Sequence, residues 1–99
     1  MNPSVWVKQP WEERLVEFDV TPALSTGDSV ASVDSVKVFL NGIVEQAAMI
    51  SGSPTIDVNK VRQKIVGGID GSNYIIRVRI VTTNGDKIED EITMKVRET

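Results

Sequence analysis

The sequence predicts an all-β fold: an immunoglobulin-like antiparallel β-sandwich of about seven strands, formed by residues 1–99 as a single domain. Three observations carry this prediction. Segment after segment alternates apolar with polar residues, which is the pattern of strands that bury one face. Turn-forming residues separate these segments at short intervals. A chain of 99 residues is long enough to close one hydrophobic core without cross-links and too short for two domains.

The strands follow an N-terminal stretch, residues 1–11, that we expect to form an extended contact segment. Asn41-Gly42 and Asn84-Gly85 supply the positive φ that hairpin turns require. The segment 43–50 is compatible with either a strand or a short helix. Alternation is clearest at residues 16–20, 36–40, 61–65, 74–81 and 92–96.

Two residues stand out within these strands. Gln63 falls on the apolar side of its strand, so we expect it at a sheet edge or beside a bulge. Tyr74 stands near the start of the penultimate strand. Immunoglobulin-like domains often place there a tyrosine that bonds to nearby backbone, and plain filling of the core explains it equally well.

The last two strands are expected to form a hairpin whose loop sets the register. With a two-residue loop, Ile80 would face Glu89, which would mix the buried and exposed faces. A three-residue loop, Thr83-Asn84-Gly85, keeps the faces apart, with Gly85 in the left-handed position of a type I turn with a bulge. We therefore predict the three-residue loop.

This register gives a role to three consecutive acids, Glu89, Asp90 and Glu91. Arg79 then lies opposite Glu89, and Arg77 lies opposite Glu91. These are structural cross-strand pairs rather than parts of a metal or acid–base site. Asp90 falls on the apolar face, where an ionised group needs a partner or water. Either the sandwich is open there, or a bulge turns Asp90 outward.

Composition argues against several functions. The chain has no histidine and no cysteine, which removes the commonest general base, the commonest metal ligand, thiol nucleophiles and disulfides. No glycine-rich phosphate motif is present. The net charge is -3, and Lys and Arg do not cluster, so we expect no nucleic-acid partner. We predict a protein that is not an enzyme, with no catalytic residue, cofactor, metal or small-molecule substrate.

The stretch around Asp70 leaves one exception open. Asp70, Ser72 and Asn73 offer oxygen ligands in an order loosely similar to a calcium loop. The twelfth position, however, is Val81 and not the glutamate that completes such a loop. A polar turn is the simpler interpretation, and calcium binding at Asp70 stays open.

No stretch of the chain has the length and hydropathy of a membrane span, and the N-terminus lacks the pattern of a secretion signal. We therefore expect a protein made in a cytoplasm, with no membrane partner.

Trp6 and Trp11 are the only tryptophans, and they flank Pro10 near the N-terminus. Large aromatic side chains that the core does not need are candidate anchors of a protein interface. Either tryptophan is also able to cap an end of the sandwich. We take both as candidate interface residues.

Short motifs along the chain occur in an order found in one family. They are Lys8-Gln9-Pro10 followed by Glu12 and Glu13, Phe18-Asp19-Val20, Gly27-Asp28-Ser29-Val30, and Gly67-Gly68, Gly71 and Tyr74 ahead of a strand that ends at Thr82-Thr83. Over nearly its whole length the chain resembles small phage virion proteins of the fibre–tail adaptor type. It departs from them at Trp11, where an acid often follows the proline, and at Gln63, which is usually apolar.

The resemblance implies a non-enzymatic structural virion protein of a bacteriophage, made in the host cytoplasm. Such a protein would be an adaptor in the tail or neck assembly that links tail and fibre components. Its partners would be other virion structural proteins, with multiple copies arranged around a symmetry axis. The alternatives are a capsid decoration protein and a bacterial surface- or carbohydrate-binding module.

Overall fold

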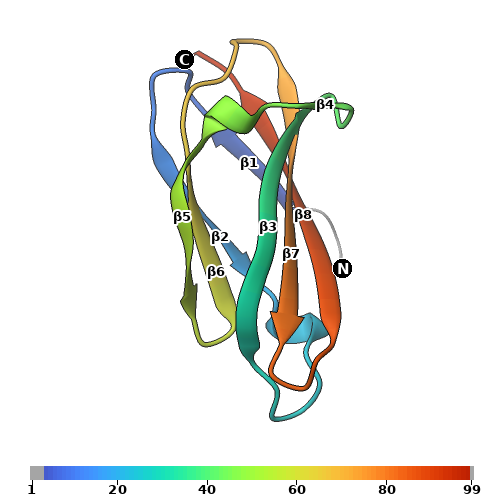
Figure 1. Ribbon diagram of the computed structural model, residues 1–99. Helices are drawn as coiled ribbons and strands as arrows, with labels where there is room; N and C mark the ends of the chain where they lie inside the picture. Colours follow the sequence, from blue (N-terminus) through green and yellow to red (C-terminus); the bar gives the residue numbers. More distant parts are fainter. Residues whose placement is uncertain (1–3, 99) are drawn as a thin grey trace.

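The computed structural model describes residues 4–98, which form a two-layered β-sandwich (Figure 1). The larger sheet has five strands in the order β1-β8-β7-β3-β4, and the smaller sheet has three in the order β2-β6-β5. The all-β prediction is confirmed, and the immunoglobulin-like classification stays a prediction. The strands are β1 (Ser4–Lys8), β2 (Arg14–Asp19), β3 (Val30–Leu40), β4 (Val44–Glu45), β5 (Ile50–Asp57), β6 (Lys60–Ile65), β7 (Asn73–Thr82) and β8 (Lys87–Val96).

Two single turns of 3-10 helix connect strands, η1 (Thr21–Ala23) and η2 (Ala47–Met49). The segment 43–50, which was compatible with a strand or a helix, contains both the short strand β4 and η2. At the β3–β4 hairpin, Asn41 and Gly42 have φ values of 52° and 76°, as the turn prediction requires.

The N-terminal strand departs from the expected antiparallel arrangement. β1 pairs with β8 in parallel, from Ser4 opposite Ile92 to Lys8 opposite Val96, whereas the other strand pairs of residues 4–98 are antiparallel. The prediction is wrong at this pair, because alternation along a sequence carries no information on the direction of a distant partner. Residues 4–8 of the expected contact segment therefore belong to the sheet. Residues 1–3 lie outside the described part of the chain.

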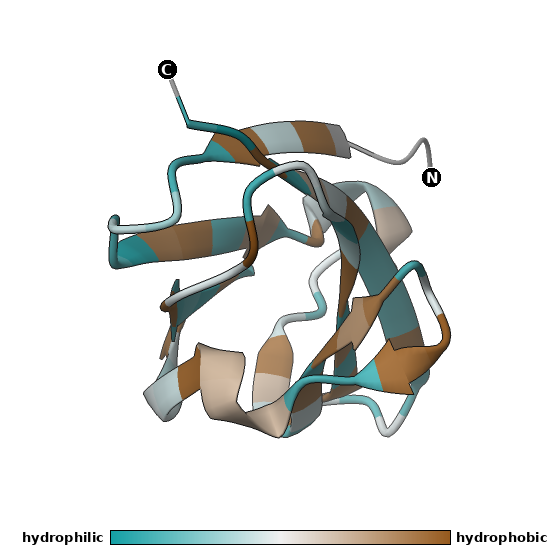
Figure 2. Cartoon of the chain, turned by 90° about the horizontal axis from the view of Figure 1, so that it is seen from above, coloured by the Kyte–Doolittle hydropathy of each residue, from teal (hydrophilic) through white to brown (hydrophobic). Residues whose placement is uncertain are grey.

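The core lies between the two sheets (Figure 2). In β7, Tyr74, Ile76, Val78 and Ile80 are each no more than 2% exposed, and the residues between them face outward. Phe18, Val61 and Ile65 reach the same core from the smaller sheet. Alternation in the sequence thus identified the buried faces of β2, β6, β7 and β8, but it did not identify β5, which has no buried residue.

The β7–β8 hairpin has the register expected from the sequence. Arg79 pairs with Glu89, and Arg77 pairs with Glu91. The Thr82 N–H donates to the Asp86 carbonyl at 2.8 Å, which leaves a loop of residues 83–85. Gly85 closes that loop with a φ of 90°.

Asp90 lies opposite Val78 without a shift in register, so no bulge turns it outward. Its carboxylate is partly buried and accepts a hydrogen bond from the Glu91 N–H at 2.8 Å. Burial raises the pKa of Asp90, and this hydrogen bond offsets part of the rise. Of the two expected arrangements, the bulge is therefore excluded, and the partial burial of Asp90 is consistent with a sandwich that is open at this point.

Gln63 is fully buried, although β6 is the central strand of the smaller sheet and not an edge. Its position beside a bulge is confirmed, because the β5–β6 register shifts between Ser51 and Thr55. The Gln63 amide nitrogen donates to the carbonyls of Ser51 and Gly52, at 3.0 and 3.2 Å, and to the Lys64 carbonyl at 3.2 Å. The side chain therefore satisfies carbonyls that the bulge removes from the ladder.

We predict that Gln63→Leu lowers the free energy of unfolding by about 1–3 kcal/mol, because buried carbonyls lose their donor. Urea denaturation measures this change. The control is Lys64→Gln, an exposed substitution in the same strand, which should change the free energy by less than about 0.5 kcal/mol. A Gln63→Leu variant as stable as the wild type would show that the bulge does not depend on this amide.

Candidate interaction site

Trp11 lies in the turn between β1 and β2, and Figure 1 shows this turn at one end of the sandwich. The Glu12 N–H donates to the Gln9 carbonyl at 3.1 Å, and the Gln9 N–H donates to a Glu12 carboxylate oxygen at 2.7 Å. Pro10 restricts the backbone between these two residues. The turn is therefore fixed at both ends, and it leaves the Trp11 side chain 92% exposed.

Lys8 anchors this turn from inside the molecule. Its residue surface is fully buried, and its ammonium group donates to the carbonyls of Gln9 at 2.8 Å, of Pro10 at 3.4 Å, and of Gly67. An ammonium group has three N–H donors, so these carbonyls match its capacity. Burial lowers the pKa of Lys8, and the charges of Glu12 and Glu13 partly oppose that effect. The contact with Gly67 joins the β1–β2 turn to the β6–β7 loop.

Trp6 has a different environment from Trp11. Its side chain is half-buried on β1 and packs against the core cluster. The Arg14 guanidinium carbon lies 5.6 Å from the centre of the Trp6 ring, within cation–π range. Trp6 thus has the position expected of a residue that caps the sandwich, and Trp11 has that of a free anchor.

Three connections at the same end of the sandwich present exposed apolar side chains. They are the β1–β2 turn, the β3–β4 hairpin and the β6–β7 loop (Figure 1). We call this surface the loop end and define it by Trp11, Ile43 and Ile69. Ile43 is 81% exposed and Ile69 is 64% exposed. Large apolar side chains held in water at one end are typical of a contact surface.

Hydrogen bonds with the Tyr74 side chain and with the Glu98 backbone hold the β6–β7 loop in place. The Ile69 N–H donates to the Tyr74 hydroxyl at 3.0 Å, so Tyr74 bonds back to nearby backbone as well as filling the core. One Asp70 carboxylate oxygen accepts the Glu98 N–H at 2.9 Å. Asp70 therefore fastens the C-terminal residues to the loop that carries Ile69.

The opposite end is closed by Asp28, a buried carboxylate. One of its oxygens accepts the N–H groups of Ser29 and Asn84, at 2.9 and 3.1 Å. Burial opposes ionisation of Asp28, but the surrounding donors, led by the Thr82 side chain, outweigh it and lower its pKa. The Thr83 N–H also donates to the Ser29 carbonyl at 2.9 Å. Asp28 thus ties the start of β3 to the β7–β8 loop.

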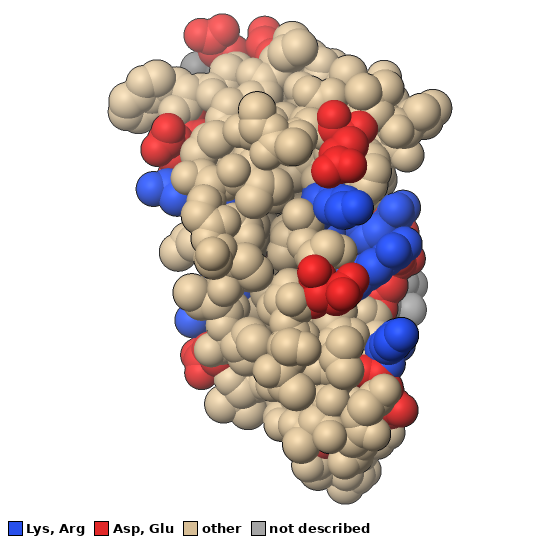
Figure 3. Space-filling view, in the orientation of Figure 1, with Lys and Arg blue, Asp and Glu red and all other residues tan. Residues whose placement is uncertain are grey.

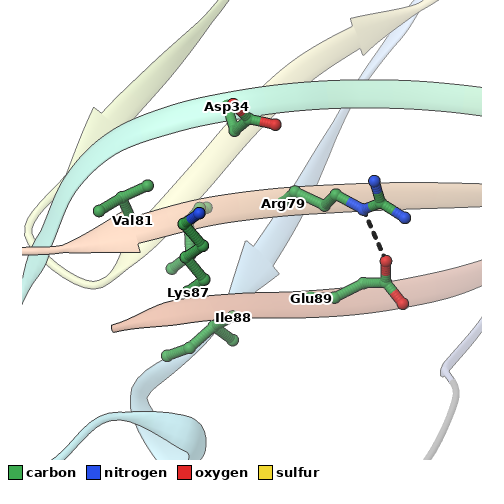
Figure 4. A pocket seen from close by; sticks show the side chains of 7 residues that line it. Asp34, Arg79, Val81, Lys87, Ile88 and Glu89 are labelled. Carbon is green, nitrogen blue, oxygen red and sulfur yellow. Dashed lines mark hydrogen bonds and ion pairs between the residues drawn. The ribbon is translucent and has the colours of Figure 1, made fainter. Parts of the chain in front are cut away.

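The three consecutive acids of β8 diverge in the folded chain. The Arg79 Nε donates to Glu89 at 2.7 Å (Figure 4). Arg77 lies 3.6 Å from Glu91, while Asp90 faces inward, opposite Val78. The hydrogen bond from Arg79 lowers the pKa of Glu89. Carboxylates on opposite faces of one strand do not converge on a common reactant or ion.

A groove of about 340 Å³ lies beside the Arg79–Glu89 pair (Figure 4). Its walls carry charges of both signs, from Asp34, Arg79, Lys87 and Glu89. Figure 3 shows the same mixture of Lys, Arg, Asp and Glu along this side of the molecule. Residues 4–98 contain no cluster of three or more His, Cys, Asp or Glu side chains that would hold a metal ion. In the same residues no helix has the length and hydropathy of a membrane span.

The sequence interpretation missed the roles of Lys8 and Asp28. Both belong to short motifs, Lys8-Gln9-Pro10 and Gly27-Asp28-Ser29, which supported the family resemblance but did not indicate that either charge is buried. Lys8 shares its strand face with Trp6, since side chains two residues apart point the same way. That parity was the available signal for its burial.

Comparison with known families gives a match over most of the chain. The model of a family described as podophage GP4 fiber-tail adaptor protein gp77 matches residues 8–95, which is most of the chain. The matched region begins at Lys8 and ends one residue before the last residue of β8. A comparison with curated proteins found no match.

We predict that Asp28→Asn is less stable than the wild type at neutral pH and that this difference narrows in acid. Because folding lowers the pKa of Asp28, its contribution is complete above the unfolded-state pKa of about 4 and is lost as pH falls through the folded-state value. Urea denaturation at a series of pH values measures it. Asp86→Asn, in the adjoining loop, controls for the loss of one negative charge. A difference between Asp28→Asn and the wild type that does not change with pH would contradict the assignment.

Proposed function

Because the chain belongs to the podophage fibre–tail adaptor family, we propose that it joins tail and fibre components of the virion as a non-enzymatic structural protein. Membership covers nearly the whole sandwich, so the family role applies to this domain and not to an appended segment. In this proposal the partners are other virion proteins, and several copies surround a symmetry axis.

The observation that carries the proposed contact is the exposure of Trp11 on a fixed turn. Burying an aromatic side chain of this size supplies much of the binding energy at many protein interfaces. The Lys8 anchor and the Gln9–Glu12 hydrogen bonds hold the turn before any partner arrives. Docking therefore loses less conformational entropy than it would with a flexible arm. We assign the loop end as the surface that meets a neighbouring virion protein.

Each copy offers a small apolar contact, so repetition around an axis would multiply modest affinities. Trp6 drops out of the proposed contact because its side chain packs on the chain's own core.

The carbohydrate-binding alternative is less well supported by the surface. Such modules commonly present a row of exposed aromatic rings. Phe18 and Tyr74 are buried, and Phe39 lies under the Arg77 guanidinium at 4.9 Å. A capsid decoration protein would use the same fold, and the tail adaptor role is favoured because the matching family is described by it.

We predict that Trp11→Ala changes the free energy of unfolding by less than about 0.5 kcal/mol, because the side chain is 92% exposed. If the side chain is an interface anchor, the affinity of the loop end for its partner should fall about thirtyfold. Incorporation of the variant into particles should fall as a result. Quantitative mass spectrometry of purified particles gives the copies per particle.

Ile56→Ala is the matched control, since Ile56 is 42% exposed on β5 and lies next to the β5–β6 turn, away from both the loop end and the edge of β2. This control variant should be incorporated into particles through the loop end in the same number of copies as the wild type. Unfolding of Trp11→Ala would assign the tryptophan to the core, and full incorporation of a folded Trp11→Ala would remove the loop end from the contact.

A further inference from the structure

The sheet margins of the sandwich differ in how well they are protected. An exposed edge strand offers unpaired N–H and C=O groups, and proteins usually shorten, bulge or cover such edges. Among residues 4–98, β4 has only two residues, and β5 is interrupted by its bulge and Pro54. β1 begins at Ser4, at the limit of the described residues. β2 is different, because all six of its residues pair with β6 without a register shift and it has no other partner in residues 4–98.

The alternation of hydrogen bonds between β2 and β6 identifies the backbone N–H and C=O groups that the open edge of β2 presents. The Val20 N–H donates to the Asn59 carbonyl at 3.0 Å, in line with the β2–β6 register. Bonded and non-bonded pairs alternate along an antiparallel ladder, so the even-numbered residues of β2 bond to β6. The N–H and C=O groups of Leu15, Glu17 and Asp19 therefore point away from β6, toward the open edge.

The side chains of these three residues face solvent, so they determine which side chains of an added strand would pair favourably with β2. Leu15 is 64% exposed, and Glu17 and Asp19 are exposed as well. Glu17 meets Arg62 of β6 through its Oε1 alone, and within residues 4–98 no donor is found for its Oε2. Opposite charges on neighbouring strands stabilise pairing, and like charges oppose it. An added strand would thus fit best with an apolar residue beside Leu15 and basic residues beside Glu17 and Asp19.

A second copy of this chain does not meet that requirement. Two β2 strands paired antiparallel about Glu17 would bring Glu17 against Glu17 and Leu15 against Asp19. Like charges would then meet across the new ladder, because the Arg62 beside each Glu17 is already engaged with its own Glu17.

We propose that β2 accepts an extended segment of another virion protein as an added strand. In antiparallel orientation that segment reads basic-x-basic-x-apolar. Main-chain hydrogen bonds would supply the attachment, and the alternate side chains would supply the selectivity. The contact is separate from the loop end, so the adaptor would have two attachment surfaces. The nature of the partner rests on the proposed function, but the test below uses only the purified chain and keeps the two claims apart.

The test measures amide hydrogen exchange by NMR with a blocked peptide, Thr-Arg-Thr-Lys-Thr-Val-Thr. This peptide should slow exchange at the N–H groups of Leu15, Glu17 and Asp19. A peptide with glutamate in place of arginine and lysine should bind at least about tenfold more weakly, because its charges repel Glu17 and Asp19. A basic peptide N-methylated on the amides that face β2 should give no protection.

A matched pair of variants tests the edge from the side of the protein. Leu15→Pro removes an N–H that faces the open edge and should abolish peptide binding without breaking the β2–β6 ladder. Leu15→Thr keeps that N–H and should retain binding.

Three results would overturn the proposal. One is peptide binding without protection of the β2 amides, and another is equal protection by the acidic and N-methylated peptides. Protection in the peptide-free chain that grows with protein concentration would instead identify a second copy as the occupant. None of these results would alter the particle incorporation that tests the proposed function.

Discussion

Lys8 places a positive charge inside the sandwich, and the position of the N-terminal strand depends on it. The ammonium group lies among three backbone carbonyls, two from its own turn and one from the β6–β7 loop. A buried cation is costly unless its donors are satisfied. Here the three carbonyls accept the hydrogen bonds of the ammonium group, so both the cation and the carbonyls have partners. The bonds hold together the two connections that present Trp11 and Ile69 at the loop end.

This arrangement keeps the core of a small domain packed while apolar side chains stay exposed on its turns. Core residues are used within the sandwich, while exposed apolar side chains sit on turns that hydrogen bonds have already fixed. Asp28 closes the other end in a similar way, with a buried carboxylate that accepts backbone N–H groups. Both ends are therefore fastened by a buried charge bound to backbone, and neither charge is left free for acid–base chemistry. That division of roles suits a structural protein whose task is to join other components.

Local sequence signals predicted the parts of the fold that depend on neighbouring residues. The β7–β8 register followed from alternation and from Gly85, because both strands and their loop are contiguous. The parallel β1–β8 pair was not predictable in this way, since it joins the two ends of the chain. Gln63 shows the same limit: its polarity indicated a bulge, but not that a central strand would bury it. For the site, the exposure of Trp11 depends on packing that no local pattern contains, whereas the parity that Lys8 shares with Trp6 was a local signal for the burial of Lys8.

The central claim is that the N-terminal strand is part of the folded domain and that Lys8 holds it there. Native-state hydrogen exchange of wild type and Lys8→Met tests it most directly. We expect wild-type β1 amides to exchange as slowly as those of β8, and Lys8→Met to speed exchange in β1 and the β1–β2 turn while β7 stays protected. Fast exchange of β1 in the wild type, at the rate of the loops, would contradict the account.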